Sequence, residues 1–334
     1  MSQTVNRRIL LAAKPSDKLE PQHFSIEDAP IDEPGAGEIL IKILYLSLDA
    51  ANRAWMQGRT YRDEVGAGVV MPGNALGEVV TSNDASFAPG DLVEGDLGWQ
   101  SYAVHPAQDL QKRTTHEPLS HLLGILGITG KTAYFGLLDV GRPKPGDVVV
   151  VSAAAGAVGS VAGQIAKHMG CQVIGITGSA KKCNWITQTL GFDGAINYRE
   201  QKVGKALREA CPQGIDVYFD NTGGDILEAA LFSMKQGGRI VCCGAVSQYD
   251  TGNPGPGPRG VPGLIVTKRL TMEGFVVMDF APRWAEAELR LAQWAEAGYI
   301  HVAEDILEGL EQAPTGLIGL LAGENTGKRL VKVA

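Results

Sequence analysis

The sequence lacks both a set of paired cysteines and a zinc-binding arrangement of cysteines and histidines. Five cysteines occur in 334 residues, and an odd number in a long chain argues against a disulfide framework. There is no CxxC pair, and the cysteines and six histidines do not form the four-ligand pattern of a structural zinc site. We therefore expect no bound metal, and we interpret most of the cysteines as small core residues.

Long apolar runs and an excess of basic residues are also missing. No apolar run reaches the roughly eighteen residues of a membrane span, and the first 20 residues lack the apolar core of a secretory signal. The net charge is −7, whereas proteins that bind nucleic acid or anionic membranes concentrate Lys and Arg. The sequence therefore predicts a cytoplasmic protein that binds neither nucleic acid nor a membrane.

Two patterns divide the chain. About the first 120 residues hold short apolar or alternating runs punctuated by Gly and Pro, which is typical of mostly antiparallel β structure. From about Thr132, Val- and Ile-rich runs alternate with helical segments, and such runs indicate parallel strands buried on both faces. The sequence predicts an α/β fold with a doubly wound parallel sheet and a second, mostly antiparallel β domain. The predicted helices of the parallel part cover residues 158–169, 181–190, 203–210 and 226–234.

The segment 251–263 contains nine Gly or Pro in thirteen residues. Pro fixes φ and Gly frees it, so we expect neither a helix nor an interior strand here. A disordered surface loop and an ordered lid both remain open, because long loops inside compact domains are often functional. The elements predicted after it are a strand at 270–278, an amphipathic helix at 283–298 that turns Trp284, Leu291 and Trp294 inward, a short helix at 305–312, and a final strand at 327–334 that can return to the first sheet.

A strand, a tight turn and a helix follow one another in VVVVSAAAGAVGS, residues 148–160. Four valines precede Ala154, Gly156 and Gly159, a form of the GxGxxG fingerprint in which alanine replaces the first glycine. Gly156 would let the backbone approach a pyrophosphate, and Gly159 would let the helix pack closely on the strand. The helix N-terminus would present free N–H groups to the anion. This context favours a dinucleotide-binding turn.

The acid that NAD-dependent enzymes use is missing after this turn. About twenty residues further on, such enzymes place an Asp or Glu on the ribose hydroxyls, yet residues 172–191 contain neither. GSAKK instead offers Ser179 and a lysine, Lys181 or Lys182, and Tyr198 ends the next predicted strand. A 2′-phosphate carries nearly two negative charges, so a lysine attracts it and a carboxylate repels it. The predicted cofactor is NADPH.

Several stretches together resemble one known family. YLSLDAANRAWM, AAAGAVGSVAGQIAK, GSAKKC, INYRE, YFDNTGG, CCGAVSQYD and TGKRLVKV occur in this order, and the likeness covers essentially the whole chain. They are similar to the zinc-free medium-chain dehydrogenase/reductases, and within these to the branch of leukotriene B4 12-hydroxydehydrogenase, prostaglandin reductase and double-bond reductases such as curcumin reductase. The resemblance implies NADPH-dependent reduction of the carbon–carbon double bond of α,β-unsaturated ketones and aldehydes.

The resemblance also implies a domain plan and an assembly. A GroES-like catalytic domain would comprise residues 1–124 and 296–334, and a Rossmann NADPH-binding domain would comprise residues 125–295. Family members are usually homodimers. Where many members read DPYMR, this chain reads Asp49-Ala50-Ala51-Asn52-Arg53, without the tyrosine that lines the substrate pocket of some relatives.

Carried over by motif, the cofactor-binding residues form three groups. The pyrophosphate would be held by Gly156, Ala157, Val158 and Gly159. The 2′-phosphate would be held by Lys182 and Tyr198, beside Ser179. The nicotinamide half would be lined by Asn221, Cys243, Gly244, Ala245, Phe275 and Asn325.

Two tyrosines are the candidates for catalysis of such a reduction. The reaction needs a hydride on the β-carbon, and negative charge then develops on the carbonyl oxygen, so the protein must place donors beside that oxygen. Tyrosine is a neutral donor at pH 7, because its reference pKa is about 10. Tyr61 matches a tyrosine that bacterial relatives place near the substrate, and Tyr249 stands directly before the segment 251–263.

Three other functions compete with this one. A zinc alcohol dehydrogenase is disfavoured, because PGNALGE has no ligand where the zinc family has the histidine of GHE. A zinc-free quinone reductase shares the fold, the cofactor and the lack of metal, and it stays open. A non-catalytic NADPH-binding sensor also stays open, although the net charge of −7 and the lack of a basic run count against an RNA-binding form.

Overall fold

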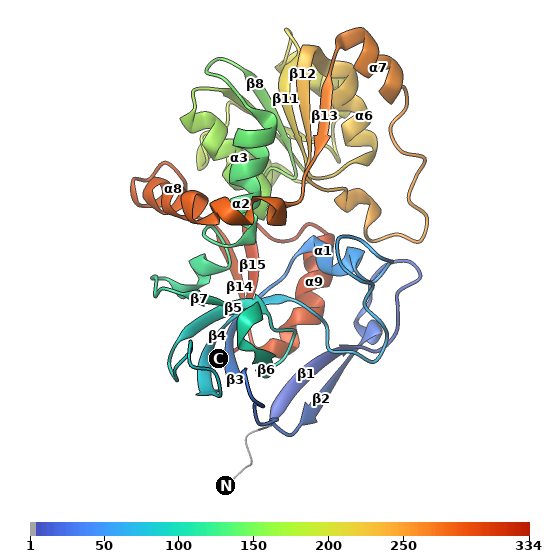
Figure 1. The fold of residues 1–334 in the computed structure, drawn as a ribbon. Coiled ribbons are helices and arrows are strands. Elements are labelled where there is room, and N and C mark those ends of the chain that lie inside the picture. Colours follow the sequence, from blue (N-terminus) through green and yellow to red (C-terminus); the bar gives the residue numbers. More distant parts are fainter. Residues whose placement is uncertain (1–4) are drawn as a thin grey trace.

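The upper lobe in Figure 1 is built around a parallel sheet, and we call it the parallel-sheet lobe. The computed structural model describes residues 5–334. The sheet has six strands, in the spatial order β10 (Gly194–Asn197), β9 (Gln172–Thr177), β8 (Val148–Ser152), β11 (Ile215–Asp220), β12 (Met234–Cys242) and β13 (Thr271–Gly274). The helices of this lobe are α2 (Ile128–Phe135), α3 (Ala157–His168), α4 (Ala180–Gln188), α5 (Val203–Ala210), α6 (Gly224–Ser233), α7 (Val261–Lys268) and α8 (Trp284–Glu296).

The lower lobe in Figure 1 is built around a mostly antiparallel sheet, and we call it the antiparallel-sheet lobe. Its seven strands are β14 (Glu304–Glu308), β15 (Lys328–Lys332), β3 (Glu38–Ser47), β4 (Asn74–Ser82), β5 (Leu92–Asp96) and β7 (Gln111–Arg113), with β6 (Tyr102–Pro106) also paired to β3. A hairpin of β1 (Asn6–Leu11) and β2 (Phe24–Ala29) and the helices α1 (Ala50–Ala54) and α9 (Ala313–Leu321) complete it. The two sheets confirm the predicted fold class, a doubly wound Rossmann sheet plus a GroES-like β domain.

The apolar core has three parts. Alternate valines of β8 enter two clusters on opposite faces of the parallel sheet, one packed with α3 and α8 and the other with α5 and α6. All five residues of β8 are buried, as a continuous apolar run in a two-faced sheet requires. The third cluster fills the antiparallel-sheet lobe. Within residues 5–334, no helix combines the length and the apolar character that crossing a bilayer takes.

Several element predictions are confirmed. The helices predicted in the parallel part coincide with α3, α4, α5 and α6 to within a few residues, and α5 has the predicted bounds. In α8, Leu291 is fully buried, and Trp284 and Trp294 pack partly buried against the same cluster, as predicted. β15 pairs antiparallel with β3, so the end of the chain does return to the first sheet.

Three element predictions are wrong. Residues 305–312 form most of β14 and a short 3-10 turn, because parallel pairing with β15 satisfies the backbone that a helix would otherwise satisfy. The segment 251–263 ends inside a helix, since α7 begins at Val261 with Pro262 in its first turn, where a missing N–H costs nothing. The strand predicted at 270–278 stops at Gly274, and a 3-10 helix occupies Val277–Arg283.

Candidate active site

The glycine-rich turn ends β8 and opens α3. Gly156 is the N-cap of α3, so Ala157, Val158 and Gly159 are its first residues, whose N–H groups have no partner within the helix. A Cβ on Gly159 would lie 2.4 Å from the carbonyl oxygen of Ala153, so only glycine permits this close approach. The turn therefore has the geometry of an anion site, a helix N-terminus packed tightly on the preceding turn.

A second group follows β9 and β10, and we call Ser179, Lys182, Tyr198 and Arg199 the adenosine corner. Ser179 is the N-cap of α4, and its Oγ accepts the backbone N–H of Lys182 at 3.3 Å. The hydroxyl of Tyr198 lies against Gly178, where a Cβ would be 2.9 Å from it. The structure thus brings three predicted residues together. Sequence reasoning missed Arg199, although INYRE places it directly after Tyr198.

The Lys182 side chain reaches from the parallel-sheet lobe to the other lobe. Its Nζ donates to the carbonyl oxygen of Gly323 at 2.7 Å. Burial is the main cause that lowers the pKa of this ammonium, and the neighbouring Arg199 and Arg329 lower it further. The adenosine corner therefore has an excess of positive charge, which a phosphate would neutralise.

The carboxyl ends of β11 and β12 form the next part of the cleft. The side-chain amide of Asn221 donates to the carbonyl oxygen of Ser152 at 2.7 Å. The N–H groups of Cys243 and Gly244 donate to the carbonyl oxygen of Asp220 at 2.9 and 3.1 Å. These contacts place the residues at the crevice between β8 and β11, where the strand order reverses and open α/β sheets bind ligands.

The side chains of Phe275 and Asn325 are each held in place by a neighbouring residue. The ring of Phe275 packs against Gly136, where a Cβ would lie 2.5 Å from its Cζ. Asn325 is buried, and its side-chain amide donates to the carbonyl oxygen of Gly327 at 2.8 Å. The N–H of Gly327 in turn donates to the carbonyl oxygen of Ala155 at 2.8 Å. Asn325 thus supports the glycine-rich turn from the other lobe.

The two candidate tyrosines come from opposite lobes and lie near each other, since Tyr249 is one of the groups that act on the pKa of Tyr61. The Tyr249 hydroxyl accepts the N–H of Ala245 at 3.1 Å, and the Tyr61 hydroxyl accepts the indole N–H of Trp55 at 3.2 Å. Partial removal from water is the main cause that raises the pKa of Tyr61, and the nearby Asp49 and Tyr249 raise it further. Because each hydroxyl acts as an acceptor in these bonds, each keeps its own proton to donate.

Residues 249–252 tie the two lobes together, and we call them the strap. The Asp250 carboxylate accepts Nε–H of Arg53 at 3.0 Å and the backbone N–H of Leu19 at 2.7 Å. The Arg53 side chain is fully buried, so Asp250 supplies its counter-charge. Figure 1 shows the following segment running along the right edge of the molecule from the strap up to α7. This docking favours a lid over a free loop.

We expect Asp250→Ala to destabilise the fold by about 3 kcal/mol, because loss of one partner leaves a buried guanidinium unpaired. Urea unfolding measures the change. Asp279→Ala is the matched control, since it removes an exposed carboxylate, and such surface changes usually stay within about 0.5 kcal/mol. A loss no larger than that of the control would mean that Arg53 does not depend on the strap.

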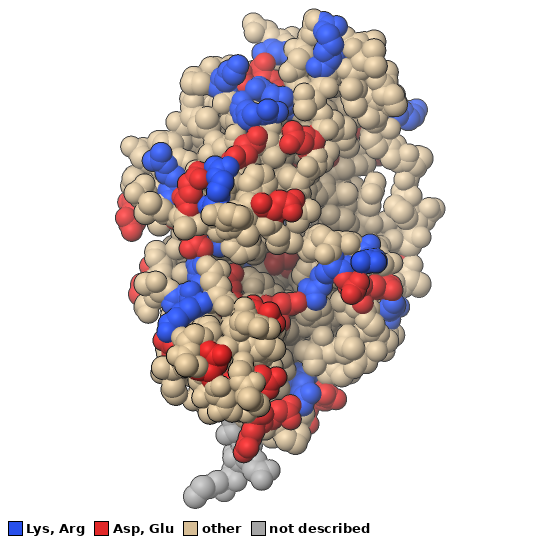
Figure 2. All heavy atoms as spheres, viewed as in Figure 1, with Lys and Arg blue, Asp and Glu red and all other residues tan. Residues whose placement is uncertain are grey.

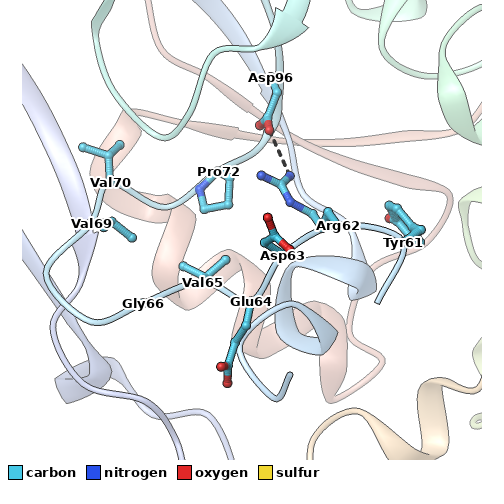
Figure 3. Close-up of a pocket in the computed structure, with 10 residues that line it drawn as sticks. All are labelled: Tyr61, Arg62, Asp63, Glu64, Val65, Gly66, Val69, Val70, Pro72 and Asp96. Atoms are coloured by element: carbon cyan, nitrogen blue, oxygen red, sulfur yellow. Dashed lines mark ion pairs between the residues drawn. The ribbon is translucent and has the colours of Figure 1, made fainter. Parts of the chain in front are cut away.

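A cavity of about 700 Å³ opens beside Tyr61 (Figure 3). On one side of it, Arg62 pairs with Asp96 at 2.9 Å, and its guanidinium lies 4.4 Å from the centre of the Trp55 ring. All ten residues that line this cavity belong to the antiparallel-sheet lobe. Figure 2 shows the molecule hollowed between the two lobes, with basic and acidic residues interspersed around the hollow. Tyr61 is 56% exposed, so a small molecule in the cavity can reach it.

Comparisons with known proteins give the family of this chain. Residues 7–113 match the family described as N-terminal domain of oxidoreductase, and residues 157–294 match the family described as zinc-binding dehydrogenase. The chain is 41% identical to NADPH-dependent curcumin reductase of Escherichia coli, over 98% of this chain and 97% of that protein. It is 41% identical to 2-alkenal reductase (NADP(+)-dependent) of Nicotiana tabacum, over 90% of this chain and 88% of that protein.

A solved structure is similar over almost the whole length. CurA from Vibrio vulnificus in complex with NADPH is 39% identical and has a TM-score of 0.93, over 98% of this chain and 99% of that chain. Among residues 5–334, His, Cys, Asp and Glu form no group of three or more that could hold a metal ion. Because these relatives are 39 to 41% identical over nearly its whole length, the chain belongs to the zinc-independent branch of the medium-chain dehydrogenase/reductases.

Proposed function

We propose that this protein uses NADPH to reduce the carbon–carbon double bond of α,β-unsaturated ketones and aldehydes. The observation that carries the proposal is the nearness of Tyr61 and Tyr249, two tyrosines from opposite lobes that would act as donors to the substrate. Donors placed where negative charge develops usually supply the largest single part of catalysis. The names of two similar proteins, curcumin reductase and 2-alkenal reductase, support the same reaction class.

The cleft fits NADPH at three places. The first turn of α3, which begins after Gly156, would face the pyrophosphate with N–H groups. Lys182 and Tyr198 in the adenosine corner would hold the 2′-phosphate, and Asn221 and Ala245 would line the nicotinamide end. The bound cofactor would supply a hydride to the β-carbon of the substrate.

The two tyrosines would stabilise the carbonyl oxygen of the substrate. Tyr249 would lie at the nicotinamide end, because its hydroxyl accepts the N–H of Ala245. The raised pKa of Tyr61 keeps that hydroxyl protonated through neutral and mildly alkaline pH, so it remains a donor. The bond from Arg53 to Asp250 anchors the strap beside Tyr249, and the strap would limit the entry of water, which would strengthen the polar contacts inside.

The loss of NADPH absorbance tests this function. Purified protein with 3-nonen-2-one should consume NADPH and yield the saturated ketone, at a higher kcat/KM than with 1,4-naphthoquinone. Faster turnover of the quinone would indicate a quinone reductase. Tight NADPH binding without turnover of any enone in a panel would indicate a sensor.

We further propose domain boundaries near residues 124 and 296. The strands of the parallel sheet all lie between β8 and β13, inside this range, whereas β14 and β15 belong to the other sheet. The catalytic domain would therefore combine residues 1–124 with 296–334, and the NADPH-binding domain would be residues 125–295.

We infer that two chains pair through the outer edge of the parallel sheet. β13 is an edge strand of this sheet, and Figure 1 shows α7 beside it. α7 has no buried residue although its sequence is VPGLIVTK, and Val266 on it is 73% exposed. A second copy would pair with the open edge and cover the apolar helix.

Light scattering should find a wild-type particle of twice the mass of one chain, and Val266→Glu should shift it to a single-chain mass. In a two-fold symmetric interface, each of the two chains would contribute one new glutamate carboxylate, and burying an unpaired charge is costly. Leu289→Glu on α8 is the control, because Leu289 is also an exposed apolar residue, at 63%. A dimeric Val266→Glu variant would remove α7 from the interface.

A further inference from the structure

Two cations of the parallel-sheet lobe are bonded to the end of one helix in the other lobe. Lys182 Nζ donates to the carbonyl oxygen of Gly323 at 2.7 Å. Arg199 Nη2 donates to the carbonyl oxygen of Ala322, the neighbouring residue, at 3.2 Å. Ala322 is the C-cap of α9. The two positive side chains therefore converge on adjacent carbonyls.

The end of α9 holds these cations without neutralising them. The last carbonyls of a helix have no partner within it, and they carry about half an elementary negative charge. Among residues 5–334, neither Lys182 nor Arg199 forms an ion pair with a carboxylate. Two positive charges thus face a helix end that offsets only part of them. The nearby acid that acts on Lys182 is Asp305, and its carboxylate is already bonded to Arg329, so the pair can still take up an anion.

Both side chains have hydrogen-bond donors that are not engaged by α9. An ammonium has three donors and a guanidinium has five, and the bonds to α9 use one donor of each. The Arg199 guanidinium also lies 5.8 Å from the centre of the Tyr198 ring, within the range of cation–π attraction. Arg199 is therefore fixed beside Tyr198 with most of its donors free.

We propose that Arg199 is a specificity-determining residue that binds the 2′-phosphate of NADPH together with Lys182, and that the end of α9 holds both cations in place for it. This rests on the proposed role of the adenosine corner in cofactor binding. A guanidinium can bind a phosphate through two parallel bonds, which an ammonium cannot do. α9 would then serve NADPH selection from the other lobe, by fixing the positions of the two cations in advance.

Equilibrium titrations of NADPH and NADH, followed by protein fluorescence, test this proposal. Arg199→Gln should raise the Kd for NADPH about fivefold and leave the Kd for NADH within about twofold, because an exposed charge is partly screened. Arg199→Glu should raise the Kd for NADPH further, and this increase should be smaller at high salt. Lys202→Gln is the control, since it removes another exposed positive charge three residues away.

A smaller ligand isolates the phosphate from the rest of the cofactor. Arg199→Gln should raise the Kd for adenosine 2′,5′-bisphosphate by the same factor as the Kd for NADPH, and it should leave the Kd for AMP unchanged. An equal loss for NADPH and NADH, or no loss for either, would overturn the assignment. These titrations contain no enone, so a failure of the proposed alkene reduction would leave their result unaffected.

Discussion

Tyr249→Phe is expected to lower kcat for enone reduction by about a hundredfold or more, because it removes a donor from the position where negative charge develops. The hydroxyl of Tyr249 accepts the N–H of Ala245 at 3.1 Å, so its proton is available to the substrate oxygen. Phenylalanine keeps the ring and its packing. Steady-state rates with saturating NADPH and 3-nonen-2-one measure the change.

The variant also breaks the bond to Ala245, so a structural effect must be separated from the chemical one. If Tyr249 acts on the substrate, the Kd for NADPH should stay within about twofold of wild type while kcat falls. Tyr299→Phe is the control, since Tyr299 is 55% exposed and lies beside His168, away from the cleft. A kcat close to wild type in Tyr249→Phe would exclude Tyr249 as the donor and would leave Tyr61 as the candidate.

Lys182→Ala is expected to raise the Kd and the KM for NADPH at least about tenfold, since a hydrogen bond between charged groups contributes about 1.5–3 kcal/mol. Binding of NADH should be nearly unchanged, because NADH has no 2′-phosphate for the ammonium to contact. The bond from Lys182 to Gly323 at 2.7 Å holds the ammonium in the adenosine corner before any cofactor binds. Titration of both cofactors by fluorescence gives the two constants.

The neighbouring lysine provides a matched control for this prediction. Lys181 is exposed in the first turn of α4, and Lys181→Ala removes the same charge one residue earlier. We expect it to change the Kd for NADPH less than about threefold. If Lys182→Ala weakens the binding of NADPH and NADH equally, the role of Lys182 is to hold the two lobes together through Gly323. Another residue would then have to select NADPH.

Local residue order was enough to predict the parallel part of the fold and two parts of the candidate site. In β8, four consecutive valines can be buried only in a sheet that is covered on both faces. Ser179 and Lys182 are three residues apart, so one helix start brings them together. Gly159 is required by its own turn, through its contact with Ala153. These relations depend on neighbours within a few positions along the chain.

The failures concern elements whose partners lie far away in the sequence. Residues 304–308 read EDILE, and this order of acidic and apolar residues also fits a short helix. Parallel pairing with β15 makes them a strand instead. α7 follows a segment rich in Gly and Pro, and Val261, Leu264 and Ile265 pack against the core only partly buried, so its inward face is short and weakly marked in the sequence. The periodicity of a segment shows which of its residues share a face, but it does not show which distant element that face packs against.

The sequence alone determined the fold class, the glycine-rich turn and the choice of lysine over carboxylate, because strand burial, helix starts and charge are properties of neighbouring residues. Only the tertiary structure decided that Tyr61 and Tyr249 lie near each other, that Asp250 neutralises Arg53, and that the end of α9 accepts bonds from Lys182 and Arg199. Each of these pairs joins the two lobes. Such contacts depend on how the lobes pack against each other, and packing is set by surface shape and burial that no short stretch of sequence contains.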